Sequence, residues 1–260
     1  MIRLIASDLD GTILQRGVPD VGESLMSVIG SLLDKGIIFV PASGRQLYSL
    51  KQLFKPFADK LMYICENGAL VKYKEKTIAK TPMDRQLAMD IINDIYAKDN
   101  CEVLIAGENT SYIRPKSQSY KIRMTQKCNY SVTLIDDFND IKDDILKISV
   151  CDERGIGYSS EYFQKRWSGK TQTAVSDVDY MDFTDLTVSK GNAMKHIQES
   201  LNISPDECMA FGDNFNDVTM LDSVAASYAM EAAADGVKKH ARFTTSSVEK
   251  TLRSVFELVI

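Results

Sequence analysis

Two aspartates, Asp8 and Asp10, stand two positions apart at the end of an apolar run that begins at Ile2. Alternate side chains of a strand share a face, so both carboxylates can converge on one point beyond the strand. Two carboxylates this close raise each other's pKa unless a cation or a shared proton relieves their repulsion. A divalent metal such as Mg²⁺ prefers oxygen ligands and would provide that relief. These residues alone leave two alternatives, a metal site or an acidic turn that closes a strand.

A second acidic cluster follows the apolar run at residues 208–211. Asp213, Asn216 and Asp217 all stand in the short segment directly after this run. Asp213 is placed to complete the oxygen coordination that Asp8 begins. Asp217 could orient these ligands without binding the metal itself. An acidic loop or a helix N-cap would have the same composition.

Ser43 and Arg45 follow another apolar run, residues 37–40, in a turn of small residues that leads into a helix. The free N–H groups of such a turn bind anions with the help of the helix dipole, and Ser43 could add its hydroxyl. The alternative is an N-cap serine followed by an arginine in the first helical turn.

Lys190 and Asn67 are weaker signals. Lys190 opens a helical stripe, where a surface lysine is unremarkable and the dipole slightly disfavours its charge. Its position makes sense if the ammonium group pairs with a transferring phosphate and with Asp8. Asn67 precedes Gly68, a pair of residues that is typical of turns.

The elements that would position these residues alternate between strands and helices. Strands are expected at residues 2–7, 37–40, 61–65 and 208–211, and helices over the apolar stripes at residues 25–33, 47–57 and 193–201. This alternation predicts an α/β fold with a Rossmann-like parallel-sheet core covered on both faces. In such sheets, sites form beyond the carboxyl ends of the strands, where all the residues above stand.

The middle of the chain has a different pattern. Between about residues 83 and 183, a helical stripe is followed by alternating segments typical of an antiparallel sheet. We therefore expect a core made of residues 1–82 and 184–260, and an inserted α+β cap domain at residues 83–183.

Composition excludes several classes of function. A net charge of -5 lacks the basic surface expected of a protein that binds nucleic acid or an anionic membrane. The chain contains no uninterrupted apolar run of roughly 18 residues, and its N-terminus leaves no room for a signal peptide, so we predict a cytoplasmic protein. Five scattered cysteines without a Cys-x-x-Cys pair argue against a disulfide framework and a zinc site.

Taken together, the segments resemble a known family. Four of them, in this order and spacing, resemble the four motifs of the haloacid dehalogenase (HAD) superfamily: Asp8-Leu9-Asp10-Gly11-Thr12, Ala42-Ser43-Gly44-Arg45, Ser189-Lys190-Gly191 and Gly212-Asp213-Asn214-Phe215-Asn216-Asp217. The loop at residues 66–69 and the insertion of about a hundred residues resemble the Cof-type branch, subclass IIB, with a C2B cap.

The resemblance implies a Mg²⁺-dependent phosphatase, a phosphoric monoester hydrolase that acts on small phosphorylated metabolites such as a sugar phosphate or a nucleotide-like cofactor. Asp8 would attack phosphorus and become an aspartyl phosphate. Asp10 would protonate the leaving oxygen and then activate water.

The resemblance also implies the ligands of phosphate and metal. The phosphate ligands would be Ser43, Lys190, Asn216 and the backbone N–H groups of Leu9 and Gly44. The metal ligands would be Asp8, Asp213 and the backbone carbonyl of Asp10, with Thr12 and Asp217 supporting them. Arg45 and Asn67 are candidate substrate contacts.

Two other functions remain as alternatives at this point. One is a phosphomutase of the same family, which would protect its aspartyl phosphate from water. The other, from a different class, is a ligand-sensing module without catalysis. The expected partner is a small phosphorylated metabolite, not a nucleic acid or a membrane, and the sequence does not indicate an oligomeric state.

Overall fold

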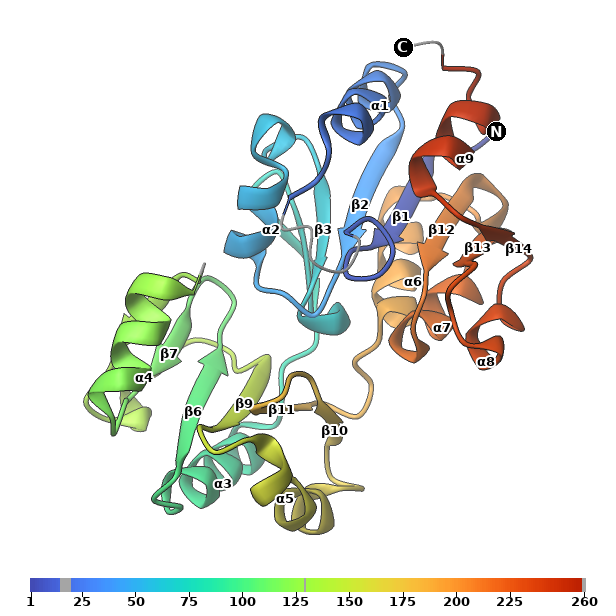
Figure 1. Ribbon diagram of the computed structural model, residues 1–260. Coiled ribbons are helices and arrows are strands. Elements are labelled where there is room, and N and C mark those ends of the chain that lie inside the picture. Colours follow the sequence, from blue (N-terminus) through green and yellow to red (C-terminus); the bar gives the residue numbers. More distant parts are fainter. Residues whose placement is uncertain (15–19, 129, 259–260) are drawn as a thin grey trace. The chain divides into compact units, whose positions relative to one another are not determined.

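A computed structural model describes residues 1–14, 20–128 and 130–258. The chain forms two compact units. The core unit consists of Met1–Ala79 and Ser189–Ile260, and the inserted unit consists of Lys80–Val188. Each unit has a sheet of its own (Figure 1).

Strands and helices alternate through most of the core unit. Its first part contains β1 (Leu4–Asp8), α1 (Glu23–Asp34), β2 (Ile38–Ala42), α2 (Leu47–Leu53), β3 (Met62–Cys65), β4 (Leu70–Tyr73) and β5 (Lys76–Lys80). Its second part contains α6 (Lys190–Leu201), β12 (Cys208–Gly212), α7 (Val218–Leu221), β13 (Ala226–Met230), α8 (Asp235–Lys238), β14 (Phe243–Thr245) and α9 (Val248–Val255).

The core strands form a sheet in the order β14-β13-β12-β1-β2-β3-β4-β5, among the described residues. From β14 to β3 the neighbours pair in parallel, so their carboxyl ends lie at one edge. This confirms the predicted α/β fold with a parallel core. β4 was not predicted, and it pairs antiparallel with β3 because the short link between them cannot make a parallel crossover.

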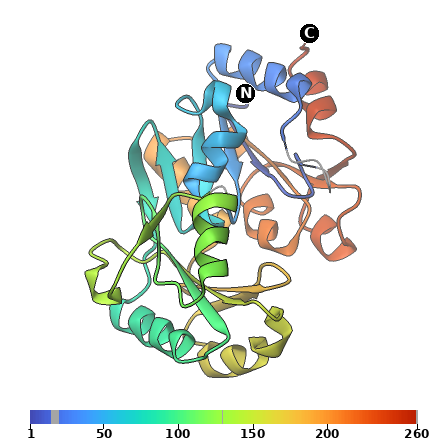
Figure 2. The same cartoon turned by 60° about the vertical axis from the view of Figure 1, so that its left-hand side comes forward.

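Helices cover both faces of the core sheet (Figures 1 and 2). Leu4 and Ala6 of β1 belong to an apolar cluster with Met194 and Ile197 of α6, and this cluster also includes residues of α7 and α8. Helices α1 and α2 lie against β2 and β3 on the opposite face, and α9 packs on α1. Because side chains alternate along a strand, Asp8 continues the Leu4 face and points toward the α6 side.

The inserted unit is an α+β structure. It contains α3 (Arg85–Tyr96), β6 (Cys101–Ala106), β7 (Ser111–Ile113), α4 (Gln118–Ile122), β8 (Val132–Leu134), β9 (Lys147–Asp152), α5 (Ser160–Trp167), β10 (Gln172–Val175) and β11 (Tyr180–Thr184). Its sheet has the order β10-β11-β9-β6-β7-β8, among the residues that the structure describes. Pairing is antiparallel from β10 to β7, as expected, whereas β7 and β8 are parallel.

Two helices cover one side of the inserted sheet. Ile91 and Ile95 of α3 pack with Phe163 and Trp167 of α5 in one buried cluster that includes strand residues such as Ile148. Trp167 also donates its indole N–H to Asp94 at 2.9 Å, so the ring is both buried and bonded.

No helix within the described parts of the chain is long and apolar enough to cross a membrane. All five cysteines are unpaired, and each except Cys128 is buried.

Candidate active site

The site lies at the carboxyl edge of the core sheet, around the end of β1. Asp8 is the last residue of β1 and stands opposite Ala42, the last residue of β2. On the other side of β1, Ser7 stands opposite Phe211 of β12. The loops that follow β2 and β12 therefore begin beside Asp8.

Lys190 is a buried cation at this edge. It is the first residue of α6, whose N-cap Ser189 accepts a hydrogen bond from the backbone N–H of Asn192 at 3.0 Å. Its Nζ donates to Asp8 at 2.5 Å and to Asp217 at 2.6 Å. Burial opposes the charge of Lys190, but the two carboxylates outweigh burial and raise its pKa. Lys190 therefore remains charged beside Asp8.

Asp217 is fully buried and has both oxygens engaged. Oδ1 accepts from Lys190, and Oδ2 accepts from the backbone N–H groups of Asp213 and Asn214 at 3.0 Å each. These bonds fix the turn Phe215–Asp217 and hold Lys190 in place. The Lys190–Asp217 contact was not predicted from the sequence.

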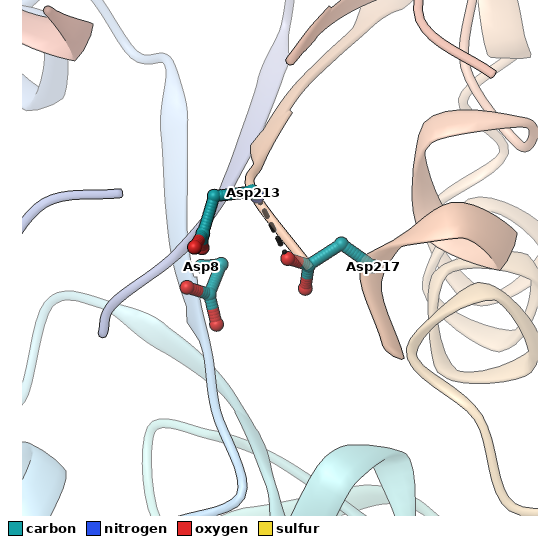
Figure 3. A group of neighbouring side chains, drawn as sticks. All are labelled: Asp8, Asp213 and Asp217. Atoms are coloured by element: carbon teal, nitrogen blue, oxygen red, sulfur yellow. Dashed lines mark hydrogen bonds between the residues drawn. The ribbon is translucent and has the colours of Figure 1, made fainter. Parts of the chain in front are cut away.

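Asp8, Asp213 and Asp217 form a group whose ligand oxygens, one from each, lie within 4.8 Å of one another (Figure 3). Burial raises the pKa of Asp8 to about 7, and the charges of Asp217 and Asp213 add to this rise while Lys190 opposes it. Burial likewise raises the pKa of Asp213.

Such a donor set fits a hard divalent cation. It offers only oxygens, and its carboxylates repel one another unless positive charge is supplied. Since Lys190 and two N–H groups already engage Asp217, the carboxylates of Asp8 and Asp213 are the better direct ligands.

The loop after β1 reaches Asp213 directly. Thr12 donates its hydroxyl to Asp213 Oδ1 at 2.9 Å. Gly11 has a positive φ of 99°, and a Cβ there would lie 2.2 Å from Asp213 Oδ2. Glycine is therefore needed at this position for its backbone conformation and for this close approach.

The loops after β2 and β3 are joined by backbone hydrogen bonds. The N–H of buried Ser43 donates to Ile64, and the Ser43 carbonyl accepts from the N–H of Asn67. The Asn67 side chain then accepts from Nδ2 of Asn216 at 3.1 Å. This contact connects the loop after β3 to the loop after β12, and a Cβ on Gly44 would lie 3.0 Å from Asn67 Nδ2.

Asp10 lies outside the carboxylate group. Its side chain is about half exposed and accepts two hydrogen bonds from Arg45, from Nε at 3.0 Å and from Nη2 at 2.5 Å. Its neighbour Leu9 is buried, and the Leu9 carbonyl accepts from the N–H of Leu14 at 2.7 Å.

The structure thus engages both candidate substrate contacts within the site, Arg45 with Asp10 and Asn67 with Asn216. Neither pairing could be expected from residue spacing, since each joins loops far apart in the chain. The one signal in the sequence was that each of these loops follows a strand of the same parallel sheet.

Comparison with known proteins gives a match along most of the chain. A family model described as haloacid dehalogenase-like hydrolase matches residues 5–256. The 5-amino-6-(5-phospho-D-ribitylamino)uracil phosphatase YbjI of Escherichia coli is 25% identical, and the match covers 95% of this chain and 91% of YbjI.

Solved structures share the same fold. A structure from Eubacterium rectale has a TM-score of 0.83 and 29% identity, covering 98% of this chain and 99% of the other. BT4131, a HAD subclass IIB sugar phosphatase, has a TM-score of 0.77, covering 98% of this chain and 100% of its own. At 18% identity, BT4131 shows likeness of fold alone.

Proposed function

The chain belongs to the haloacid dehalogenase-like hydrolase family, and we propose that it hydrolyses phosphate monoesters of small metabolites with the help of Mg²⁺. The match over residues 5–256 confirms the family that the motifs predicted. The predicted enzyme class, a phosphoric monoester hydrolase, agrees with the class of its named phosphatase relatives.

One observation carries the proposal for the mechanism. Lys190 lies 2.5 Å from Asp8 in a buried setting. A carboxylate can attack an anionic phosphate ester only where positive charge offsets their repulsion. In this environment Asp8 is suited to be the nucleophile.

In the first step, Asp8 forms a bond to phosphorus and the bond from phosphorus to the leaving oxygen breaks. Asp10 gives its proton to that oxygen. In the second step, a water molecule loses a proton to Asp10 and attacks the phosphorus of the aspartyl phosphate, which restores Asp8 and releases phosphate.

Five groups would hold the phosphoryl oxygens during both steps. Ser43 and Asn216 offer side-chain donors, Lys190 offers charge, and Leu9 and Gly44 offer backbone N–H groups. The Asn67–Asn216 contact supports this arrangement by fixing the orientation of one donor.

Asp8, Asp213 and the backbone carbonyl of Asp10 would hold Mg²⁺, while Thr12 and Asp217 steady Asp213. When bound, the ion supplies positive charge that draws the phosphate ester toward Asp8 and stabilises the charge that develops on transfer.

The substrate class is proposed from a named relative. YbjI is named for a ribityl phosphate joined to a pyrimidine. We therefore propose a sugar phosphate or a nucleotide-like phosphorylated cofactor as substrate. The insertion at residues 83–183 would be the cap domain, and residues 1–82 and 184–260 the catalytic core.

A phosphate-release screen over phosphorylated metabolites tests the proposal. Phosphate should appear with Mg²⁺ for at least one sugar phosphate or nucleotide-like compound, and should disappear when the metal is chelated. Efficient isomerisation of a hexose phosphate with negligible hydrolysis would identify a phosphomutase instead. Absence of both reactions would contradict the proposal that the protein is an enzyme acting on these phosphate esters.

A further inference from the structure

We infer that Arg45 is a positioning residue, which holds the carboxyl group of Asp10 in place for proton transfer to the leaving oxygen. The inference rests on the proposed function, because it concerns the acid step of that reaction. It assigns Arg45 a role different from the substrate contact expected from the sequence.

The first observation is the geometry of the pair. Two guanidinium nitrogens of Arg45 face the two oxygens of Asp10, at 3.0 and 2.5 Å. This pair of hydrogen bonds, a fork, fixes the orientation of the Asp10 carboxyl plane. A single hydrogen bond would not fix that orientation.

The second observation is that the Asp10 side chain is more than half exposed among the residues that the structure describes. The side chain of Asp10 is 57% exposed, so packing does not select its rotamer. The backbone around it is fixed, because Gly11 donates to Leu14 while Thr12 and Leu14 donate to Leu9. The two hydrogen bonds from Arg45 thus restrain the Asp10 side chain, which the backbone bonds of the turn do not hold.

The third observation is that Arg45 is itself anchored on both sides. Its backbone N–H donates to Ser43 Oγ at 3.3 Å, and its carbonyl accepts from the N–H of Glu66 at 3.2 Å. The guanidinium therefore extends from a loop tied to a phosphate-binding candidate and to the loop after β3. Because the backbone of Arg45 is held in place, its guanidinium group can hold the Asp10 carboxyl group in place as well.

The chemistry explains why such a clamp is useful. As Asp8 bonds to phosphorus and the ester bond breaks, the proton of Asp10 passes to the leaving oxygen and Asp10 becomes a carboxylate. That carboxylate is the form that two N–H donors stabilise, and it then accepts a proton from water. An exposed ion pair adds little to folding stability, whereas correct placement of an acid has a large effect on rate.

The effect of a variant on esters with different leaving groups distinguishes a residue that positions the acid from a phosphate ligand or a substrate contact. Dinitrophenolate leaves without a proton, whereas phenolate needs one in the transition state. Loss of a residue that positions the acid should therefore slow the hydrolysis of phenyl phosphate selectively. Loss of a phosphate ligand, a substrate contact or overall structure should slow the hydrolysis of both esters.

The experiment measures kcat/KM with Mg²⁺ for phenyl phosphate and 2,4-dinitrophenyl phosphate. We expect Arg45→Met to lower the value for phenyl phosphate about 100-fold and that for the dinitrophenyl ester by less than about threefold. Arg45→Lys keeps the charge but not the fork, so it should recover only part of the loss.

Two further variants complete the design. Arg3→Met removes a similarly exposed ion pair in the same unit, Arg3–Glu207 at 3.1 Å. This variant should leave kcat/KM unchanged for both esters. In an Asp10→Asn background, Arg45→Met should have no further effect on phenyl phosphate, because the acid it positions is gone.

Equal losses for the two esters, full rescue by Arg45→Lys, or an undiminished rate for phenyl phosphate would each overturn the inference while the proposed function stands. A wild-type protein that hydrolyses neither ester would overturn the proposed function, and the inference with it.

Discussion

Lys190 is the residue on which the charge balance of the site depends. It places one buried positive charge between two carboxylates, Asp8 and Asp217, at 2.5 and 2.6 Å. Removing one partner from a buried ionic group costs far more than an exposed ion pair contributes, because the remaining charges lose their compensation. The lysine therefore has a structural role besides its proposed contact with phosphate.

Lys190→Met should lower the free energy of unfolding by about 3–5 kcal/mol, measured by urea denaturation. Lys195→Met removes an exposed lysine from the same helix and should change it by less than about 0.5 kcal/mol. Similar losses in the free energy of unfolding for the two variants would contradict the claim that buried Lys190 compensates the charges of its carboxylate partners.

At the scale of elements, the site depends on how closely its loops and helices approach one another. The start of α6 lies against α7 at Gly191, whose N–H donates to the Thr219 hydroxyl at 3.1 Å. A Cβ on Gly191 would lie 2.3 Å from the Thr219 carbonyl oxygen. A larger residue must therefore push apart the helix that carries Lys190 and the helix that follows Asp217.

Gly191→Ala should destabilise the protein by about 1–3 kcal/mol, despite the better helix propensity of alanine, and should reduce phosphate release. Urea unfolding and a phosphate assay measure the two effects. Gly157 is an exposed glycine with open space around it, so Gly157→Ala is the matched control. A Gly191→Ala protein as stable and active as this control would show that the close contact is unimportant.

Much of the core could be predicted because its signals are local. Apolar runs such as residues 208–211 mark buried parallel strands, and the stripe from Leu25 marks the helix that covers them. The structure adds elements with weaker patterns, such as β4, α5 and β11. α5 is short and rich in charged residues, so its apolar stripe has only Phe163 and Trp167 as buried members.

The candidate site residues could be named from their place in the alternating pattern, but their partners could not, apart from the Lys190–Asp8 pair. The Arg45–Asp10 and Lys190–Asp217 pairs each join segments that meet only in the folded sheet. Spacing along the chain has no information on which oxygen a distant nitrogen reaches. The parallel sheet brings the loops to one edge, and side-chain packing then selects the pairs.

At the scale of the whole molecule, the site connects stability to pH and metal. Burial raises the pKa of Asp8 to about 7 in the metal-free fold, above its value in the unfolded chain. The folded state then holds a proton that the unfolded state does not. This contribution to stability is present at low pH and is lost as the pH rises through about 7.

Mg²⁺ should therefore raise the melting temperature more at about pH 8 than at about pH 6, because at the lower pH it must displace a proton from Asp8. Calorimetry with and without Mg²⁺ at the two pH values measures this. Asp8→Asn removes the ligand whose pKa is about 7, so the smaller rise in melting temperature that Mg²⁺ gives this variant should depend less on pH. A wild-type shift that is equal or larger at the lower pH would contradict the assignment of Asp8 to the metal.

The central claim is that Asp8 attacks phosphorus, and the most direct test is phosphate release by Asp8→Asn. The substitution preserves the shape of the side chain and removes its nucleophilic charge. With saturating Mg²⁺, and with an unchanged circular dichroism spectrum, we expect release from 4-nitrophenyl phosphate to fall by about 1,000-fold or more. A folded Asp8→Asn protein that keeps activity within about tenfold of the wild type would contradict Asp8 as the nucleophile.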